Sequence, residues 1–556
     1  MKCVIIFFFL SHLLNLTTPS VLAQELPPHF FSYEIARGLI EPTSIAFLPN
    51  HDVLISEKSG KIKRLKIGQD KFDTYFQVKT ETTGERGLQS VIVHPDFPNT
   101  PYFFIYYTKS DGSRNRFSRI KVIGEILREE ILIEFEPMNK EAVYHNGGGV
   151  TILDNKIYLG IGEQYGLNSQ DLNSYNGKII RINIDGTIPT DNPISEGSLV
   201  QRSTWSYGLR NPFTIDADKV TKKIFVNDVG YDSWEEINDA SKPFLFFGWP
   251  YGEGDISHYN PNFPFVDPIF KYPNIVSNKT DITENKGCAI TAGVFYRPSK
   301  SSFPNEYIGK YFFSDMCNGW IRTLDPASFE QKIFAKKMES GTFGFKYSSE
   351  GDLFYLNYFE GSLKKIVYDT VASPRFLRNI SDLVAVLGDT LIISTSISGN
   401  SEMKMKWFKD GKQIAGLDST SITFKGLSRS SSGTYFAVAY NSFGSDSSNF
   451  FKILVKKPNS KLNSEISFTK IEPILRKNGC SVCHNKETKL IGPPFIEIAK
   501  RGYTNARILA LLNKPEPKNW PDYPIPMASM SNLNQEEALK IAQWINSLTS
   551  NKSPKK

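Results

Sequence analysis

The stretch TSIAFLPNHDVLISEKSGKIKRL, residues Thr43–Leu65, contains the pattern from which the fold follows. A short apolar run is followed by a polar turn, a second short apolar run, a glycine and a segment that mixes basic and apolar residues. Short runs of this kind, bounded by turn residues, are typical of β-strands joined in sequence. The stretch therefore predicts consecutive short strands separated by tight turns.

The same pattern returns further along the chain. It is seen again in GGGVTILDNKIYLGIGEQ (Gly147–Gln164) and in FGFKYSSEGDLFYLNYFEGSLKKIVY (Phe343–Tyr368). Self-similar groups of strands, repeated over about 50 residues, indicate the blades of a β-propeller. At roughly 50–60 residues per blade, residues 27–368 predict an all-β propeller of about six blades with four strands each.

The first residues predict export. MKCVIIFFFLSHLLNLTTPSVLAQ has one basic residue, a short apolar run and small residues at Val21 and Ala23, so we expect a signal peptide over 1–23. No later apolar stretch reaches the about 18 residues that a transmembrane helix needs. We therefore expect a periplasmic or secreted protein without a transmembrane segment. The formal net charge of +7 is mild and spread along the chain, which argues against nucleic acid as a partner.

Residues 373–456 predict a different all-β unit. Trp407, in WFKDGKQI, is placed like the core tryptophan of an immunoglobulin-like β-sandwich. Tyr435, in SSSGTY, is placed like the tyrosine whose hydroxyl bonds back to the backbone in that fold. The segment resembles this module, although neither inter-sheet cysteine is present and Ala437 stands at the second cysteine's place. We expect a spacer or docking role.

The segment NGCSVCHNKE, Asn478–Glu487, contains Cys480, Cys483 and His484 in the spacing C-x-x-C-H. This spacing predicts covalent c-type haem, with thioether bonds from both cysteines and the histidine as an iron ligand. A zinc site needs four ligands, and no second cysteine–histidine pair lies nearby in the sequence. A thioredoxin-like redox pair needs a βαβ context, which the sequence does not predict here.

Residues 464–550 resemble the small class I cytochrome c domain, which is all-α. The shared features are the C-x-x-C-H motif, IGPPF, PIPM and a closing helix EEALKIAQWINSL. By this resemblance Met527 is the distal iron ligand, with Met530 as the alternative, and the carbonyl of Pro493 supports His484. With both axial positions filled, such a domain transfers single electrons.

The order of motifs within residues 27–368 resembles the glucose/sorbosone dehydrogenase family. These motifs include GERGLQSVIVHPDF, HNGGGVTIL, IGEQ, WSYGLRNPF and NDVGYDSWEEIN, followed by GWP. Each motif alone is weak, and their order makes the match specific. The resemblance implies a six-bladed propeller that binds pyrroloquinoline quinone (PQQ) and calcium and oxidises aldoses.

His145 is the residue that we expect to act as the catalytic base. Oxidation of a sugar at its anomeric carbon needs a group that takes the hydroxyl proton, and histidine titrates near neutral pH. Tyr144 and Glu163 are expected near the sugar, where glucose-oxidising members of the family have an acid and a shorter aspartate. Arg210 is expected to clamp the carboxylates of the quinone, with Asn211 beside it.

Three further cofactor contacts are expected. Arg297, in VFYRP, is a candidate second cation for the quinone. The glycines Gly147–Gly149 allow a flat cofactor to approach the backbone closely. By resemblance, calcium binds backbone carbonyls at Gly230 and Tyr231 and polarises the cofactor's carbonyl groups.

Two assignments have structural alternatives. Arg210 can instead be a core arginine that pairs with Glu235 or Glu236. Cys288 and Cys317, which lie outside the haem motif, are expected to form one disulfide in an oxidising compartment. The alternative for these cysteines is a pair of buried free thiols.

Together these features predict a quinoprotein dehydrogenase with a built-in electron acceptor. A sugar or polyol reduces the quinone, the electrons pass to the chain's own haem, and a periplasmic or surface partner takes them onward. The rival hypothesis is a non-enzymatic propeller that binds a glycan or a protein and bears an electron-transfer cytochrome domain. A binding protein of that kind is not expected to hold quinone and calcium.

Overall fold

The computed structural model describes most of the chain from Gln24 onward. The described residues are 24–66, 69, 71–139, 141, 143–166, 168–256, 264–274, 286–371, 373–377, 380, 382–388, 391–395, 397–399, 403–424, 426–456, 468–523, 527, 530, 533 and 535–550. The signal peptide expected over 1–23 and residues 524–526 of the PIPM motif lie outside this set.

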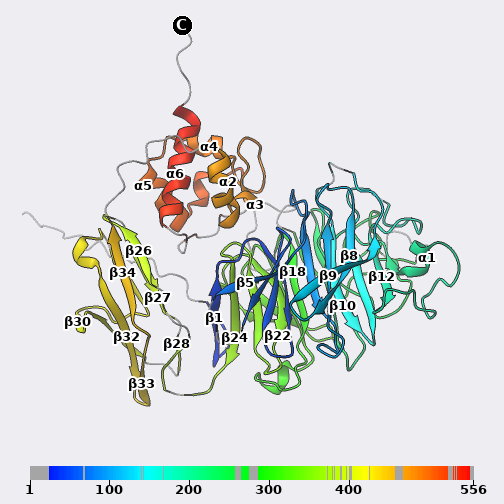
Figure 1. The fold of residues 1–556 in the computed structure, drawn as a ribbon, viewed down its shortest axis with the longest axis horizontal. Helices are drawn as coiled ribbons and strands as arrows, with labels where there is room; N and C mark the ends of the chain where they lie inside the picture. The colour runs from blue at the N-terminus through cyan, green and yellow to red at the C-terminus, as the bar shows by residue number, and fades with distance from the viewer. Residues whose placement is uncertain are drawn as a thin grey trace, which may run out of the picture.

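Six four-stranded sheets form the largest body of the protein, on the right in Figure 1. The first three sheets are β2 (Pro42–Phe47), β3 (Val53–Glu57), β4 (Lys61–Leu65) and β5 (Phe72–Gln77); β6 (Leu88–Val93), β7 (Tyr102–Thr108), β8 (Asn115–Ile123) and β9 (Ile126–Glu134); and β10 (Gly147–Leu153), β11 (Lys156–Ile161), β12 (Lys178–Asn183) and β13 (Thr204–Tyr207). The other three are β14 (Pro212–Ala217), β15 (Ile224–Asp228), β16 (Trp234–Asp239) and β17 (Phe270–Pro273); β18 (Ile290–Phe295), β19 (Tyr311–Asp315), β20 (Ile321–Leu324) and β21 (Gln331–Ala335); and β22 (Thr342–Tyr347), β23 (Leu353–Asn357), β24 (Ser362–Tyr368) and β1 (Phe30–Arg37). Two short helices, α1 (Leu199–Ser203) and η1 (Asn305–Tyr307), lie in the connections. The predicted six-bladed propeller is confirmed.

The ring closes where the two ends of the propeller sequence meet. β1 pairs antiparallel with β24, with Phe30 opposite Tyr368. Phe30 is 6% exposed, and its ring packs edge-on against Phe303 and Phe334. Because the first strand of the chain completes the last sheet, no blade is left with an incomplete edge.

The cores between neighbouring blades are filled from both faces of the strands. In β7, Phe103, Ile105 and Tyr107 pack into one core, and Phe104 and Tyr106 pack into the next. A strand buried on both faces needs apolar residues at consecutive positions rather than at alternate ones. This explains the unbroken run YFFIYYT in β7.

The innermost strands are β2, β6, β10, β14, β18 and β22, which pack side by side around a central channel. In five sheets all four strands follow one another outward from the channel, and in the sixth β22, β23 and β24 do so before β1 completes the outer edge. All six innermost strands therefore begin at the same end of the propeller. We call this end the entrance face. The loops that precede the innermost strands therefore meet there.

A β-sandwich follows the propeller. Its strands are β25 (Arg375–Phe376), β26 (Leu383–Val386), β27 (Leu391–Ser394), β28 (Ile397–Ser398), β29 (Lys404–Lys409), β30 (Lys412–Ile414), β31 (Ser421–Phe424), β32 (Gly433–Asn441), β33 (Gly444–Ser447) and β34 (Phe451–Lys456), with the short helix η2 (Arg429–Ser431) before β32. Trp407 is fully buried in the core of this unit. The hydroxyl of Tyr435 donates to the carbonyl of Ser431 at 2.8 Å, as the predicted tyrosine corner requires.

The C-terminal region is a small helical unit. It contains α2 (Phe468–Lys477), α3 (Cys480–Cys483), α4 (Phe495–Lys500), α5 (Asn505–Asn513), η3 (Pro517–Asn519) and α6 (Gln535–Ser550). Trp544 of α6 is 2% exposed, and its ring lies 5.0 Å from that of Phe495 in α4. The predicted all-α class is confirmed. In Figure 1 this unit lies above the sandwich and the propeller, with α3 toward the propeller.

Within the described part of the chain, no helix has both the length and the apolar character that crossing a bilayer requires.

Candidate active site and haem site

His145 lies directly before β10, at the entrance face, and is 6% exposed. Its Nδ1 is 2.7 Å from Glu163 Oε1, and its Nε2 is 2.7 Å from Arg210 Nη2. A guanidinium only donates hydrogen bonds, so Nε2 is the acceptor in the contact with Arg210. Nδ1 then bears the hydrogen and donates a hydrogen bond to the Glu163 carboxylate. The two neighbours thus favour the tautomer with hydrogen on Nδ1, in which the lone pair of Nε2 accepts from Arg210.

The backbone at His145 is held in an unusual conformation. Its φ is +57°, in the left-handed region that few residues other than glycine adopt. Glu85 Oε2 accepts from the His145 amide at 2.9 Å and from Asn211 Nδ2 at 3.2 Å. Gly162 passes so close that a Cβ there would overlap the carbonyl oxygen of His145. Such a conformation persists only where the surroundings impose it, and here they fix where the imidazole ring lies.

Arg210 and Asn211 precede β14 at the same face. Their backbone amides both donate to the carboxylate of Asp228, at 2.9 and 2.6 Å. Asn211 Oδ1 also accepts from the amide of Gly147 at 2.9 Å, which joins the starts of β14 and β10. Burial raises the pKa of Asp228 to about 7. These contacts position both residues through their backbones and leave the guanidinium of Arg210 to face the site.

The Arg210 guanidinium lies near two aromatic rings, with the centroid of Tyr231 at 5.4 Å and that of Trp249 at 5.6 Å. Its Nη1 donates to the carbonyl of Gly230 at 2.7 Å. Arg210 Nε and Trp249 Nε1 are buried and have no hydrogen-bond partner among the residues that the structure describes. A ligand that brings acceptor oxygens would satisfy both of these donors.

This group of side chains fits a planar anionic cofactor such as PQQ. The guanidinium offers charge and directed donors to a carboxylate, and the flanking rings offer apolar faces to a flat ring system. Neither Glu235 nor Glu236 pairs with Arg210: the first accepts from Asn274 Nδ2 and the second from the Gly254 amide. The alternative of a core arginine paired with one of these glutamates is therefore wrong.

The expected calcium ligands lie beside Arg210. The carbonyl of Gly230 faces the guanidinium, which is itself a cation, and the amide of Tyr231 donates to Glu253 Oε1. Within the described residues, the only group of three metal-ligating side chains is Cys288, Asp315 and Cys317. An ion beside Gly230 would thus bind backbone oxygens of this chain and take further ligands from outside it.

Arg297 is not part of this site. Its Nε and Nη2 donate to Asp218 Oδ1 and Oδ2 at 2.8 and 2.9 Å. Asp218 follows β14, whereas Arg210 precedes it, and eight residues of extended chain span about 26 Å. Arg297 thus lies at the opposite end of the propeller from the entrance face. The expectation that it provides a second cation for the quinone is wrong because its guanidinium is paired with Asp218 at that other end.

Glu163 and two of the glycines make contacts that the sequence did not predict. Glu163 is 1% exposed and its carboxylate faces His145 Nδ1, so its position suits orientation of the base rather than contact with a sugar. A Cβ on Gly148 would press on the side chain of Gln89, and one on Gly149 would press on Ile215. These glycines are therefore needed for the packing of neighbouring innermost strands, whether or not a cofactor approaches them.

Tyr144 lies at the rim of the site. It is partly buried, and its ring is edge-on to that of Tyr165 at 6.4 Å. Tyr165 in turn lies 4.3 Å from the His145 ring and is 50% exposed. The two tyrosines therefore stand between His145 and solvent.

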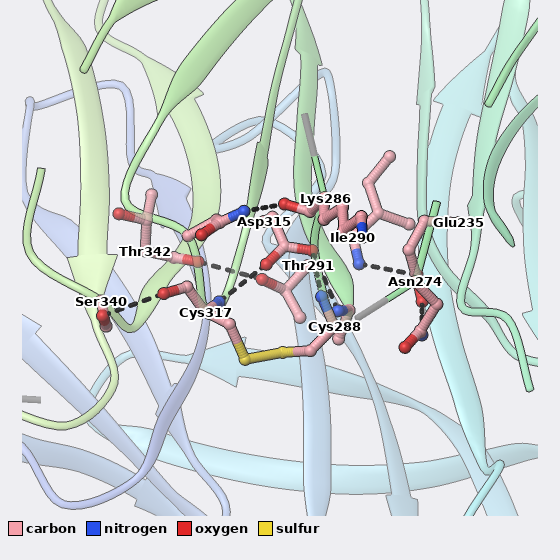
Figure 2. The surroundings of a disulfide bond; sticks show 12 residues. Glu235, Asn274, Lys286, Cys288, Ile290, Thr291, Asp315, Cys317, Ser340 and Thr342 are labelled. Carbon is pink, nitrogen blue, oxygen red and sulfur yellow. Dashed lines mark hydrogen bonds between the residues drawn. A yellow bond between two sulfur atoms is a disulfide. The ribbon is translucent and has the colours of Figure 1, made fainter. Parts of the chain in front are cut away.

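Cys288 and Cys317 form a disulfide at the same face, and Figure 2 shows its surroundings. The bond joins the loop before β18 to the loop after β19. Asp315 lies between these loops and accepts from the amides of Cys288 and Cys317 at 2.9 and 2.8 Å (Figure 2). Burial raises the pKa of Asp315 to about 6.

The C-x-x-C-H segment has the features that covalent haem requires. Cys480 and Cys483 are free thiols on the single turn α3, and His484 follows them. His484 Nδ1 donates to the carbonyl of Pro493 at 2.7 Å, since a carbonyl can only accept. This leaves Nε2 of His484 free to bind iron, as the resemblance implied for this pair.

Both candidate distal ligands pack against the core of the helical unit. Met527 and Met530 are partly buried there, and Met530 also packs against the propeller. A haem bound through α3 would therefore find a thioether from either residue within the same core, and the choice between Met527 and Met530 stays open.

The comparisons with known proteins agree with this geometry. The model of the glucose/sorbosone dehydrogenase family matches residues 39–328, more than half of the chain. The chain belongs to this family. A model of the immunoglobulin I-set domain matches residues 374–451.

Individual relatives of this glucose/sorbosone dehydrogenase family member match separate parts of it. Quinoprotein glucose dehydrogenase B of Acinetobacter calcoaceticus is 29% identical over 317 residues, covering 50% of this chain and 63% of that protein. The chain thus spans just over three fifths of the first propeller relatives that it matches. Cytochrome c-551 of Azotobacter vinelandii is 31% identical over 78 residues, which is 13% of this chain and 92% of that protein. The PQQ-bound aldose sugar dehydrogenase of Streptomyces coelicolor has the same fold, with 22% identity, a TM-score of 0.50, and coverage of 62% of this chain and 99% of that one.

Four residues of this family member's site escaped the sequence analysis. They are Glu85, Tyr165, Asp228 and Trp249. Glu85, Asp228 and Trp249 stand within the motifs GERGL, NDVG and GWP, so a signal for them was present in the sequence. Tyr165 follows IGEQ directly, and only its left-handed backbone, with φ of +57°, brings its ring over His145.

Proposed function

We propose that this chain is a quinoprotein dehydrogenase that oxidises an aldose-type sugar, or a related alcohol, with PQQ and passes the electrons to its own c-type haem. The observation that supports it most is the contact between His145 and Arg210, 2.7 Å apart at the entrance face. A proton acceptor beside an anion-binding cation is what oxidation with an anionic quinone needs. Membership of the glucose/sorbosone dehydrogenase family and the cytochrome c-like region support the same chemistry.

The main chemical task of the chain's own residues would be to remove the proton of the substrate's hydroxyl group. When bound, PQQ supplies a two-electron acceptor and haem a one-electron carrier. His145 Nε2 would take the proton of the anomeric hydroxyl as the C=O bond forms, and the hydride of the breaking C–H bond would go to the bound two-electron acceptor. Glu163 accepts a hydrogen bond from Nδ1, and its negative charge stabilises the imidazolium that results.

Arg210 has to change partners for this to happen. Its Nη2 donates to His145 Nε2, the atom that must meet the substrate hydroxyl. A carboxylate of the cofactor is a stronger acceptor for a guanidinium than a neutral imidazole, so cofactor binding would draw Arg210 away and expose Nε2. Gly230 and Tyr231 would hold calcium through their backbone oxygens, where the ion would polarise the cofactor's carbonyl groups.

The place of action in the cell is part of the proposal. A cleavable signal over residues 1–23 and a C-x-x-C-H motif suit an exported protein. The substrate would then be a sugar or polyol outside the cytoplasm, and a periplasmic or surface protein would reoxidise the haem.

The test is a visible spectrum of the oxidised, haem-loaded protein during incubation with calcium, with and without PQQ, and then with a panel of aldoses and polyols. We expect reduction of the haem only when PQQ and a suitable sugar are both present. His145→Ala should lower this rate by about 10²–10⁴-fold, the usual contribution of a general base, while leaving the haem spectrum unchanged. Retained reduction in this variant would show that His145 is not the base.

A protein that binds no PQQ and shows no haem reduction with any sugar would overturn the proposal. That result would favour the rival, a propeller that binds a glycan or a protein and bears a cytochrome domain with an external electron donor.

A further inference from the structure

The helical haem-binding region contacts the propeller through a polar pair of bonds. Arg476, in α2, donates from Nη2 to Thr82 Oγ1 at 2.8 Å and to Glu41 Oε2 at 3.4 Å. Glu41 is 5% exposed, and the Arg476 side chain is 34% exposed. Because one partner is buried and the bond to Thr82 has good geometry, the contact is better defined than an ion pair between two exposed side chains.

An apolar contact lies next to this polar one. The side chains of Cys483 and Met530 pack against the propeller cluster that contains Tyr358 and Phe359. Gly479 approaches so closely that a Cβ there would lie 3.2 Å from the Cα of Phe359. The part of the helical region that touches the propeller thus includes the turn that holds the haem-binding cysteines.

The propeller residues in this contact all belong to the entrance face. Glu41 directly precedes the innermost strand β2, and Thr82 lies in the connection from β5 to β6. Tyr358 and Phe359 lie in the turn between β23 and β24, at the end where β22 begins. The helical region therefore lies on the face that holds His145.

Charged side chains link the contact to the candidate active site. Lys58 Nζ lies 3.5 Å from Glu41 Oε1, next to the carboxylate oxygen that receives Arg476. Burial lowers the pKa of Lys58, while Glu41 and Glu85 act in the opposite direction. Glu85 accepts the amide hydrogen of His145 at 2.9 Å. One run of neighbouring charges thus extends from Arg476 to the backbone of the proposed base.

We propose that Arg476, Gly479 and Cys483 form a docking surface that holds the haem-binding turn against Glu41, Thr82 and Phe359, and that this docked arrangement is the one in which the haem accepts electrons from the propeller. The inference rests on the proposed function. A haem attached through Cys483 has one edge at this contact, because the thioether bond joins that side chain to the porphyrin. Docking makes the transfer intramolecular, so its rate does not depend on encounter between molecules.

The test compares the full, haem-loaded chain with two variants that act from opposite sides. Arg476→Glu places a negative charge against buried Glu41, and Thr82→Arg places a second guanidinium against Arg476. Lys500→Glu makes the same change of charge at an exposed position of α4 and serves as the control. Amide hydrogen exchange is measured over residues 78–87 and 355–361, which form the propeller side of the contact.

We expect both variants to raise exchange in these two segments by about tenfold or more, and the control to leave it unchanged. The rate of sugar-driven haem reduction should fall by about tenfold or more in both variants. Sugar oxidation with a small soluble dye that takes electrons from the propeller should stay at the parent rate, because neither side chain touches the candidate active site.

Unchanged exchange in both variants would overturn the docking surface. Raised exchange with an unchanged rate of haem reduction would overturn its role in electron transfer. Failure of the proposed function looks different, since the parent protein would then show no sugar-driven haem reduction at all, while the exchange data would still decide whether the surface exists.

Discussion

At His145, two groups of opposite charge act on one imidazole ring. Glu163 accepts from Nδ1 and Arg210 donates to Nε2, each at 2.7 Å. The carboxylate accepts a hydrogen bond from Nδ1, and the guanidinium occupies the lone pair of Nε2 until another donor replaces it. Replacement of one donor by another at Nε2 is therefore the step that would make this ring active.

Glu163→Gln tests the orienting role of the carboxylate. The amide keeps the size of the side chain but can present its NH₂ group to Nδ1, which would reverse the tautomer and remove the lone pair from Nε2. We expect kcat for sugar oxidation to fall by about 10- to 100-fold, with a smaller effect on KM. Steady-state rates with a soluble dye over a range of pH provide the measurement.

Glu129→Gln is the matched control for this change. Glu129 accepts from the hydroxyls of Tyr107 and Ser118 at 2.6 and 2.7 Å, in another blade. It should leave kcat unchanged. A Glu163→Gln variant as active as this control would contradict the orienting role.

At this scale the sequence predicted the residue types better than their contacts. His145, Arg210 and Asn211 come together as expected, because each directly precedes an innermost strand. Arg297 also lies next to an innermost strand, β18, but it follows this strand and so lies at the other end of the propeller. Telling these two ends apart requires the direction of each strand, which a motif alone does not give.

At the scale of elements, closure of the ring depends on β1. Phe30 of this strand is 6% exposed and packs against rings from the neighbouring blade. Phe30→Ala should lower the free energy of unfolding of the propeller by about 3–5 kcal/mol, the usual effect of removing a buried aromatic side chain. Urea unfolding followed by tryptophan fluorescence provides the measurement.

Phe329→Ala removes the same group from a position that is 38% exposed. It should change the free energy of unfolding by no more than about 0.5 kcal/mol. Equal effects of the two substitutions would contradict the role of β1 in closing the ring.

The elements themselves were largely readable from the sequence. The turn residues and the repeated strands predicted the six blades, and Trp407 and Tyr435 predicted the sandwich. The role of Gly147–Gly149 could not be predicted from the sequence. A glycine that lets a ligand approach the backbone and a glycine that lets a neighbouring strand approach it look the same in the sequence. Only the packing of β10 against β6 and β14 distinguishes the two roles.

At the scale of the molecule, buried carboxylates predict how stability depends on pH. Burial raises the pKa of Asp315 to about 6, of Asp228 to about 7 and of Glu236 to about 8. The ordinary values are 3.8 for aspartate and 4.5 for glutamate, so between these limits the folded chain keeps protons that the unfolded chain releases. The free energy of unfolding should therefore fall as pH rises from about 5 to about 8, and each group contributes on the order of 1 kcal/mol per pH unit up to its own raised pKa.

Urea unfolding at a series of pH values measures this dependence. Asp228→Asn removes one of the titrating groups and should make the fall with pH less steep, whatever it does to stability itself. Stability that rises from about pH 5 to about pH 8 in the parent protein would contradict the protonated state of these carboxylates.

The arrangement of the whole molecule was the part least accessible from the sequence. The motifs predicted a propeller, a sandwich and a cytochrome c-like unit, but a contact such as that of Arg476 with Thr82 joins residues 394 positions apart. Nothing in the local sequence of either residue signals its partner. The proposed haem domain lies on the entrance face, and this placement leads to the central claim that the haem receives electrons within the same chain.

The most direct test is anaerobic stopped-flow mixing of the haem- and PQQ-loaded protein with a saturating sugar, followed at the visible haem band over about a hundredfold range of protein concentration. An internal transfer predicts first-order reduction of the haem with the same rate constant at every concentration. A rate that rises in proportion to protein concentration, or sugar oxidation without haem reduction, would contradict the claim.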